Sequence, residues 1–281
     1  MKFVRYGAQG AEQVGLLDKQ GSIRQLPTEL AHLVDLPLAA ADLERVRQLD
    51  VEALEKVSGN PRLGAVVNRV PNIFAIGLNY APHVEEAKLQ LPSEPMLFNK
   101  ATSCLAGAND DIVMWPGSAA LDWEVELGVV IGKAAFQVSE AQALEHVAGY
   151  CIVNDVSERN WQLNRGGQWG KGKSAPGYGP IGPWLVTPDE IADPQDLQVE
   201  LRVNGAVMQS ASTAEMIFGV AFLIAHLSQF MRLEPGDVIS TGTPSGVGVA
   251  RTPPVFLNVG DVVELSISHL GQQRQCVVAP A

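Results

Sequence analysis

An acidic pair inside an apolar run limits how this chain can fold. Residues 121–132 read Leu-Asp-Trp-Glu-Val-Glu-Leu-Gly-Val-Val-Ile-Gly, and the pattern predicts a strand over residues 122–133. Because strand side chains alternate between faces, Asp122, Glu124 and Glu126 point the same way. Either this is an edge strand with a solvated polar face, or the carboxylates are buried with a partner that offsets their repulsion.

A third carboxylate, Asp155, ends the next predicted strand, residues 149–155. An all-oxygen ligand set suits Mg²⁺, Mn²⁺ or Ca²⁺ better than zinc or copper. Glu124, Glu126 and Asp155 are therefore candidate ligands of a hard divalent cation.

The overall charge disfavours two classes of partner. Lys plus Arg number 20 and Asp plus Glu number 31, which gives a net charge of −11. Nucleic acid and an anionic membrane surface are therefore not expected, although a local basic pocket for an anionic metabolite is compatible with this balance.

The composition also predicts a compartment. Cys104, Cys151 and Cys276 are scattered, which is typical of ordinary buried thiols in a reducing environment. The N-terminus lacks the apolar run of a secretory signal, and the apolar stretch 216–227 is far shorter than a bilayer span. We expect a cytoplasmic protein.

The chain divides into two predicted parts. Residues 1–70 read as a small N-terminal α/β domain with short strands and a helix over residues 41–57, and residues 71–281 as a larger strand-rich domain. The expected class is α+β and β-rich. In the larger part, strands are predicted over 73–78, 96–100, 262–268 and 273–279, a hairpin over 197–209 turning at Asn204-Gly205, and helices over 82–89 and 212–230.

Residues 167–174 match the phosphate-loop pattern G-x-x-x-x-G-K-[ST], but their context disagrees with it. A phosphate loop needs an apolar strand before it and a helix beginning at its Lys-Ser. Here residues 158–165 are polar, and Pro176, Pro180 and Pro183 prevent a helix. Lys173 remains a candidate cation for an anion pocket.

Two further pairs carry candidate chemistry. His83 and Glu86 lie three residues apart at the start of a short helix, either as a general base held by a carboxylate or as a surface contact. Arg159 and Gln162 share a helix face just after Asp155, where they either bind a substrate carboxylate or face solvent.

Two strand ends complete the candidates. The small-residue loop 240–248 ends a strand and either brings backbone amides to a ligand or is a tight turn. Lys100 ends another strand and adds a cation.

Taken together, these segments resemble the fumarylacetoacetate hydrolase family. The matching motifs run in family order over residues 73–281: Gly77-Leu78-Asn79-Tyr80 with His83 and Glu86, Phe98-Asn99-Lys100, Asp122-Trp123-Glu124-Val125-Glu126, Asn154-Asp155, Lys173-Ser174, Gly182-Pro183-Trp184, and Thr241-Gly242-Thr243-Pro244 with Gly246-Val247-Gly248.

The resemblance implies a catalytic domain built as a mixed β-roll, preceded by a small N-terminal domain and paired as a homodimer. It makes Glu124, Glu126 and Asp155 the ligands of Mg²⁺, or of Mn²⁺ in its place. The other implied roles are catalysis for His83, Glu86 and Lys173, and substrate binding for Arg159, Gln162, Lys100, Tyr80, Gly242 and Thr243.

One departure from the family pattern concerns residues 174–178, Ser-Ala-Pro-Gly-Tyr, where relatives commonly carry an Asp-Thr-like pair. We expect this difference to alter the pocket wall and so the substrate specificity.

The activity that the resemblance implies is magnesium-dependent hydrolysis of a carbon–carbon bond in a 2,4-diketo acid. Members acting on sugar-derived acids suggest 2,4-diketo-3-deoxy-L-rhamnonate or L-fuconate, which yield pyruvate and L-lactate in carbohydrate catabolism. The alternatives within the family are an oxaloacetate decarboxylase, an acylpyruvate hydrolase and a dicarboxylate isomerase. The alternative from another class is a non-catalytic, metal-dependent metabolite-binding protein.

Overall fold

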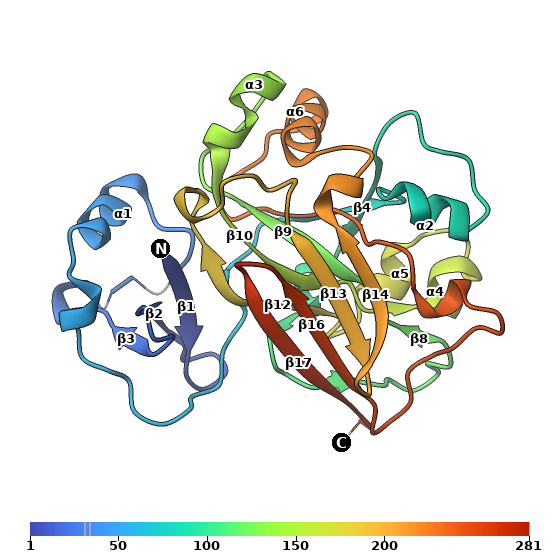
Figure 1. Cartoon of the computed structure of the whole chain (residues 1–281), viewed down its shortest axis with the longest axis horizontal. Coiled ribbons are helices and arrows are strands. Elements are labelled where there is room, and N and C mark those ends of the chain that lie inside the picture. The colour runs from blue at the N-terminus through green and yellow to red at the C-terminus, as the bar shows by residue number, and fades with distance from the viewer. Residues whose placement is uncertain (31, 34, 281) are drawn as a thin grey trace.

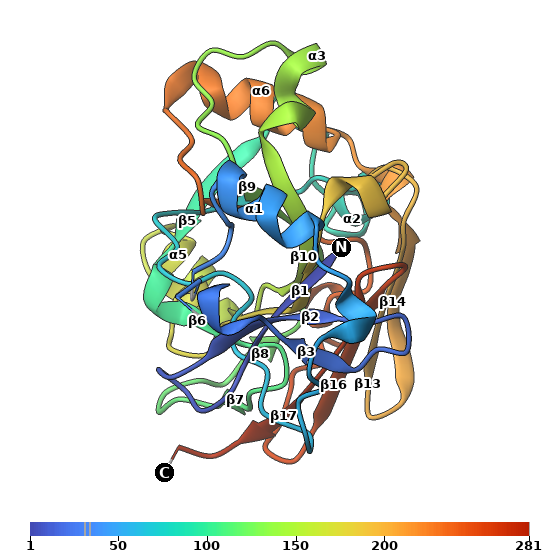
Figure 2. The same cartoon turned by 90° about the vertical axis from the view of Figure 1, so that its left-hand side faces the viewer.

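Strands dominate the computed structural model, which describes residues 1–30, 32–33 and 35–280 (Figures 1 and 2). The strands are β1 (Lys2–Tyr6), β2 (Gln13–Leu17), β3 (Ile23–Gln25), β4 (Ile73–Gly77), β5 (Met96–Lys100), β6 (Leu105–Gly107), β7 (Ile112–Val113), β8 (Leu121–Asp122), β9 (Val125–Ile131), β10 (Val147–Asn154), β11 (Ser157–Glu158), β12 (Gly179–Val186), β13 (Gln198–Val203), β14 (Ala206–Ser212), β15 (Val238–Ser240), β16 (Val262–Ile267) and β17 (Gly271–Val278).

The helices are short. They are α1 (Ala40–Arg47), α2 (Ala81–Glu86), α3 (Glu140–Ala143), α4 (Arg159–Leu163), α5 (Gly170–Lys173) and α6 (Val220–Phe230), with 3₁₀ turns at Thr28–Leu30, Val51–Ala53, Thr102–Cys104, Leu144–His146, Pro188–Glu190, Thr213–Glu215 and Gly248–Ala250. The β-rich α+β class predicted from the sequence is confirmed.

The acidic strand lies in the middle of the main sheet, whose order is β3-β2-β1-β12-β10-β9-β15-β4-β5 with β6 also paired to β12. β9 runs antiparallel to both β10 and β15, and all of Val125–Ile131 is buried. The predicted strand over 122–133 is split, because Leu121–Asp122 pairs with β11 instead. The interpretation as a solvated edge strand is therefore wrong.

A second sheet, in the order β14-β13-β16-β17-β7, covers one face of the first (Figure 1). Its strands β13 and β16 contact β9, and β17 contacts β12. The predicted hairpin turn is confirmed, since Asn204 (φ 51°) and Gly205 (φ 80°) both adopt the left-handed conformation of a type I′ turn. The acidic cluster thus lies on strands whose positions two sheets fix.

The N-terminal strands extend the main sheet. β1 pairs antiparallel with β12, with Lys2 opposite Val186, so β1, β2 and β3 continue the sheet that holds β9. The helix predicted over residues 41–57 is shorter, because Asp50 caps a separate turn through its side chain. The domain boundary near residue 70 stays a prediction.

The helix predicted over residues 212–230 is also divided. Ser212 and Glu215 form the predicted capping box, but they cap only the turn Thr213–Glu215. α6 begins after Gly219, because the intervening backbone is bound by Asn79, whose side-chain oxygen accepts from the Phe218 N–H (2.8 Å).

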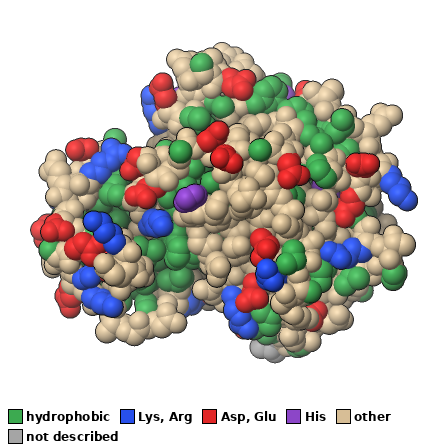
Figure 3. All heavy atoms as spheres, viewed as in Figure 1, with side chains coloured by type: hydrophobic (Ala, Val, Ile, Leu, Met, Phe, Trp, Pro, Cys, Tyr) green, Lys and Arg blue, Asp and Glu red, His purple; other side chains and the backbone are tan. Residues whose placement is uncertain are grey.

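Two thiols are buried as predicted, Cys104 and Cys151, whereas Cys276 is half-buried. None of the helices in the described part of the chain is long and apolar enough to cross a membrane. On the face shown in Figure 3, acidic and basic side chains are interspersed.

Candidate functional site

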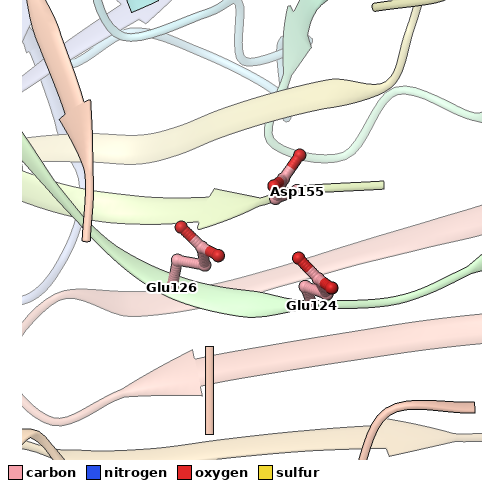
Figure 4. A group of neighbouring side chains, drawn as sticks. All are labelled: Glu124, Glu126 and Asp155. Carbon is pink, nitrogen blue, oxygen red and sulfur yellow. The ribbon is translucent and has the colours of Figure 1, made fainter. Parts of the chain in front are cut away.

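Three buried carboxylates meet where β9 and β10 run side by side (Figure 4). One oxygen from each of Glu124, Glu126 and Asp155 lies within 4.8 Å of the others. The antiparallel register produces this grouping: the Asp155 N–H donates to the Glu124 carbonyl (2.9 Å), and Val153 lies opposite Glu126. The sequence prediction that these side chains come together is borne out by the geometry.

Two buried lysines contact the cluster. Lys173 Nζ donates to Glu124 Oε2 (2.6 Å) and to Asp155 Oδ2 (2.7 Å). Lys100 Nζ donates to Asp155 Oδ1 and to the Tyr178 carbonyl (2.9 Å). Asp155 therefore has a cation on each of its two oxygens.

Arg159 supports the cluster from α4, and it is buried rather than solvent-facing. Its Nη2 donates to Glu124 Oε1 (2.6 Å), its Nη1 to Gln162 Oε1 (2.9 Å) and its Nε to Asp122 Oδ2 (2.8 Å). The guanidinium thus orients both a carboxylate of the cluster and the amide of Gln162.

Asp122 is a residue of the site that the sequence prediction left out. Besides Arg159, it accepts from the N–H groups of Gly248 (2.7 Å) and Val249 (2.9 Å). The strand alternation that put Asp122 on the face of Glu124 was a signal for it. Asp122 joins the carboxylate strand to the loop 241–248.

The end of β15 and the loop after it bind the carboxylate of Glu126. Glu126 Oε2 accepts from Ser240 Oγ (2.5 Å) and from the Gly242 N–H (3.0 Å). Thr243 Oγ1 donates to the Val125 carbonyl (2.9 Å) and accepts from Gln209 Nε2 (2.8 Å). The small-residue loop therefore does bring a backbone amide to the cluster, where it contacts a carboxylate.

The electrostatics of the two glutamates differ. Burial would raise the pKa of Glu124, but Lys173 and Arg159 outweigh it and hold that pKa below its usual range. Burial, with Asp155 and Glu124 nearby, raises the pKa of Glu126 to about 8. Close-packed, buried carboxylate oxygens are a donor set that fits Mg²⁺ or Mn²⁺, whose charge would offset this repulsion.

His83 and Glu86 form a partly buried, hydrogen-bonded pair, not a surface contact. His83 is buried, and its Nδ1 lies 3.2 Å from Glu86 Oε2. The Gly246 N–H donates to Glu86 (3.0 Å). Partial burial would raise the pKa of Glu86, but the hydrogen bonds from His83 and Gly246 lower it overall.

His83 of this pair and all three carboxylates of the cluster line one cavity of about 50 Å³. Its lining includes eight of the predicted site residues, together with an apolar wall: Ile76, Gly77, Leu78, His83, Phe98, Glu124, Glu126, Asp155, Arg159, Gln162, Trp169, Lys173 and Thr243. Lys100 and Gly242 lie outside this lining but contact Asp155 and Glu126 directly, and Glu86 and Tyr80 also lie outside it. The hydroxyl of Tyr80 is buried, with no hydrogen-bond partner among the described residues.

The residues of the phosphate-loop pattern supply a cation and a wall instead of a phosphate cradle. α5 ends at Lys173, so no helix begins at Lys173-Ser174. Ser174 Oγ accepts from the Ala101 N–H (2.9 Å), and residues 174–177 are absent from the cavity lining. The expectation that this departure alters the pocket wall is therefore wrong for the described cavity.

Comparison with known proteins gives the chain a family. A family model described as fumarylacetoacetate (FAA) hydrolase C-terminal matches residues 72–278. A Burkholderia multivorans protein described only as a hydrolase is 54% identical over 276 residues, which are 98% of each chain.

Solved structures agree with this match. The fumarylacetoacetate hydrolase of psychrophilic Exiguobacterium antarcticum is 36% identical, with a TM-score of 0.87 and full coverage of both chains. The fumarylpyruvate hydrolase of Pseudomonas aeruginosa, solved with Mn²⁺ and pyruvate, is 27% identical, with a TM-score of 0.70 over 80% of this chain and 99% of that one.

Proposed function

The chain belongs to the fumarylacetoacetate hydrolase family, and we propose that it is a metal-dependent hydrolase that cleaves a carbon–carbon bond of a 2,4-diketo acid. The observation that carries this proposal is that one cavity is lined both by the Glu124, Glu126, Asp155 cluster and by His83, whose ring Glu86 contacts. The Mn²⁺ and pyruvate named for the Pseudomonas structure support both a divalent cation and a pyruvyl product.

Glu124, Glu126 and Asp155 are the residues that would hold Mg²⁺ or Mn²⁺. When bound, the ion supplies positive charge that stabilises negative charge developing on the departing pyruvyl group. Catalysis also needs an activated water and a proton for the leaving carbon, and residues of this chain can provide both.

His83 is placed to act as the general base. Nδ1 of His83 is hydrogen-bonded to Glu86, and the Gly246 N–H donates to Glu86 in turn. The imidazole therefore has a fixed orientation, and its Nε2 is the nitrogen that can accept a proton from water. His83 would take a proton from water as its oxygen bonds to C4. The bond between C3 and C4 then breaks, and C3 receives the electron pair and finally the proton.

The cationic side of the cavity would bind the keto-acid end of the substrate. Lys173 Nζ lies between Glu124 and Asp155, where it can stabilise negative charge on an oxygen of the leaving group. Gln162 is oriented by Arg159, and Thr243 lines the same cavity. Each terminal nitrogen of Arg159 carries a second N–H, which could donate a hydrogen bond to a substrate carboxylate.

We extend the proposal to a candidate substrate and setting. The sugar-derived acids 2,4-diketo-3-deoxy-L-rhamnonate and L-fuconate, which would yield pyruvate and L-lactate, are the candidates that the motif resemblance supports. A cytoplasmic homodimer acting in sugar-acid catabolism is part of the same proposal.

A substrate panel with and without Mg²⁺ or Mn²⁺ tests the function. We expect pyruvate and a second acid in equal amounts, with loss of activity in EDTA. Carbon dioxide without a second acid would point to decarboxylation, and a rearranged acid without cleavage to isomerisation. Binding of Mn²⁺ and pyruvate with no turnover across the panel would favour a metabolite-binding protein.

The variant His83→Ala tests the base. Its kcat should fall about 10²–10⁴-fold, because general base catalysis is lost. Its Mn²⁺ affinity should stay that of the parent, since His83 is not a proposed ligand. His32→Ala, an exposed histidine, is the matched control and should retain full activity.

A further inference from the structure

The lining of the cavity has a charged part and an apolar part. One carries the carboxylates and the cations Lys173 and Arg159. The other is formed by apolar groups, of which Leu78, Phe98 and Trp169 are the largest. A substrate whose keto-acid end binds at the charged part must place its remaining atoms against this apolar wall.

Trp169 is fitted closely onto the edge of the main sheet. A Cβ atom at Gly77 would lie 2.5 Å from Cζ3 of the indole, closer than two carbons can approach, so only glycine is compatible with this seat. Gly77 pairs with Met96 in the sheet register, and the Phe98 ring lies 5.4 Å from the indole at 62°, an edge contact. The indole therefore cannot move inward to make room.

The indole of Trp169 can move only outward, and the exposed backbone that precedes Trp169 permits this movement. Gly166 (φ 79°) and Gly167 (φ 70°) form a left-handed turn, and residues 163–168 are exposed. After Trp169, Gly172 packs so tightly on α4 that an added Cβ would lie 2.5 Å from the Gln162 nitrogen. The backbone after Trp169, which leads to Lys173, is thus fixed by its packing on α4. The backbone before Trp169 is an exposed turn.

Charge at the apolar part limits what can bind there. Lys173 Nζ lies 5.3 Å from the centroid of the Phe98 ring, but both lining cations, Lys173 and Arg159, are already bound to carboxylates of the cluster. Arg165 and Lys171 lie outside the lining, with Lys171 Nζ donating to the Arg165 carbonyl (2.8 Å). A second substrate carboxylate placed against Phe98 and Trp169 would lose its hydration and find Lys173 already shared by Glu124 and Asp155, which is unfavourable.

We propose that Trp169 is the specificity-determining residue of this site, and that it selects 2,4-diketo acids with one carboxylate and a short, uncharged acyl group. This inference rests on the proposed function. With the indole in place the cavity measures about 50 Å³, so each carbon added to the acyl group must displace the indole further. Acids with a second carboxylate at the acyl end are poor substrates.

Turnover of three substrates by the Mn²⁺-loaded enzyme tests the proposal: acetylpyruvate, hexanoylpyruvate and fumarylpyruvate. The parent should prefer acetylpyruvate over both by at least about tenfold in kcat/KM, the scale on which pockets discriminate added carbons. Trp169→Ala should raise kcat/KM for hexanoylpyruvate relative to acetylpyruvate at least about tenfold, with no gain for fumarylpyruvate. Trp169→Arg should raise the relative rate for fumarylpyruvate.

Trp115→Ala is the control, because Trp115 donates to the Pro176 carbonyl away from the cavity lining. It should leave the order of the three substrates unchanged. A parent that turns over fumarylpyruvate as well as acetylpyruvate, or a Trp169→Ala enzyme with the parent's substrate order, overturns the proposal.

Binding of two matched probes separates this inference from the proposed reaction. 2-Oxopentanoate and 2-oxoglutarate have the same chain length and differ in the distal carboxylate. Calorimetry on the Mn²⁺-loaded parent should show at least about tenfold tighter binding of 2-oxopentanoate, and Trp169→Arg should narrow or reverse the difference. If 2-oxopentanoate binds more tightly but no diketo acid is cleaved, the proposed hydrolysis is wrong while the proposed selectivity stands. If both probes bind equally, the proposed selectivity is wrong.

Discussion

Arg159 donates hydrogen bonds to three different side chains, so its loss should affect the stability of the protein as well as the candidate site. It is the cation for Asp122 and one of two for Glu124, all of them buried. A buried ion pair contributes little over an apolar pair of the same shape, but removing one partner leaves an uncompensated charge in the interior.

We therefore predict that Arg159→Met lowers the free energy of unfolding by about 3–5 kcal/mol. Arg202→Met is the control, because Arg202 and Glu200 form a pair whose side chains are 42% and 37% exposed. Such a surface pair contributes little to stability, because water and salt screen it. Urea denaturation of both variants checks this; a loss in Arg159→Met no larger than that in Arg202→Met would contradict it.

At this scale, the sequence predicted the residues whose grouping follows from a local rule. Glu124 and Glu126 share a face because strand side chains alternate, and they remain together in the structure. The contacts of Lys173 did not follow from any local rule. They depend on where α5 packs, which the sequence around Lys173 does not encode.

Among the larger elements, Asn79 connects segments far apart in the chain. Its side chain donates to the carbonyls of Phe218 (3.0 Å) and Thr241 (2.7 Å) and accepts from the Phe218 N–H (2.8 Å). It thereby ties the chain entering α2, which carries His83, to the start of α6 and to the loop that holds Glu126.

We predict that Asn79→Ala destabilises the protein by about 1–3 kcal/mol for each buried group left unpaired. The Phe218 amide should also lose protection from hydrogen exchange, which is a readout specific to this link. Asn164→Ala, which removes one exposed contact to Asn160, should change stability by less than about 0.5 kcal/mol. Full protection of Phe218 in Asn79→Ala would rule out the link.

The same residue explains why the helix predicted over residues 212–230 was wrong while the hairpin at Asn204-Gly205 was right. A two-residue hairpin turn depends on the φ angles of its own residues. The break before α6 depends on a side chain 139 positions away in sequence. Local patterns predict elements of the first kind and cannot predict those of the second.

Across the whole molecule, the order of strands is the part that the sequence does not show. β1 and β12 are adjacent although more than 170 residues separate them, and β15 lies between β4 and β9. Of the candidate ligands, Glu124 lies just before β9, Glu126 in β9 and Asp155 just after β10. Lys173 ends α5, and the Gly242 amide belongs to the loop after β15. The stability of an ion held by this cluster would therefore depend on groups that most of the sheet positions.

We predict that Mn²⁺ stabilises the whole molecule, because an ion that binds only the folded chain adds RT ln(1 + [L]/Kd), about 2.7 kcal/mol at one hundred times Kd. Glu126→Gln should lose most of this gain, since it keeps the shape of the side chain and removes its charge. Without metal, the variant should be at least as stable as the parent, because one of three adjacent carboxylates is gone.

Urea denaturation in EDTA and in Mn²⁺ measures both effects, with the half-exposed Glu264 providing the control variant Glu264→Gln. Glu264 lies on β16, where its partner is Arg274, so its loss should leave the Mn²⁺ gain intact. If Glu126→Gln gains as much stability from Mn²⁺ as Glu264→Gln does, the ion binds elsewhere. Glu126 would then be a buried acid held by Ser240 and Gly242 for a structural reason.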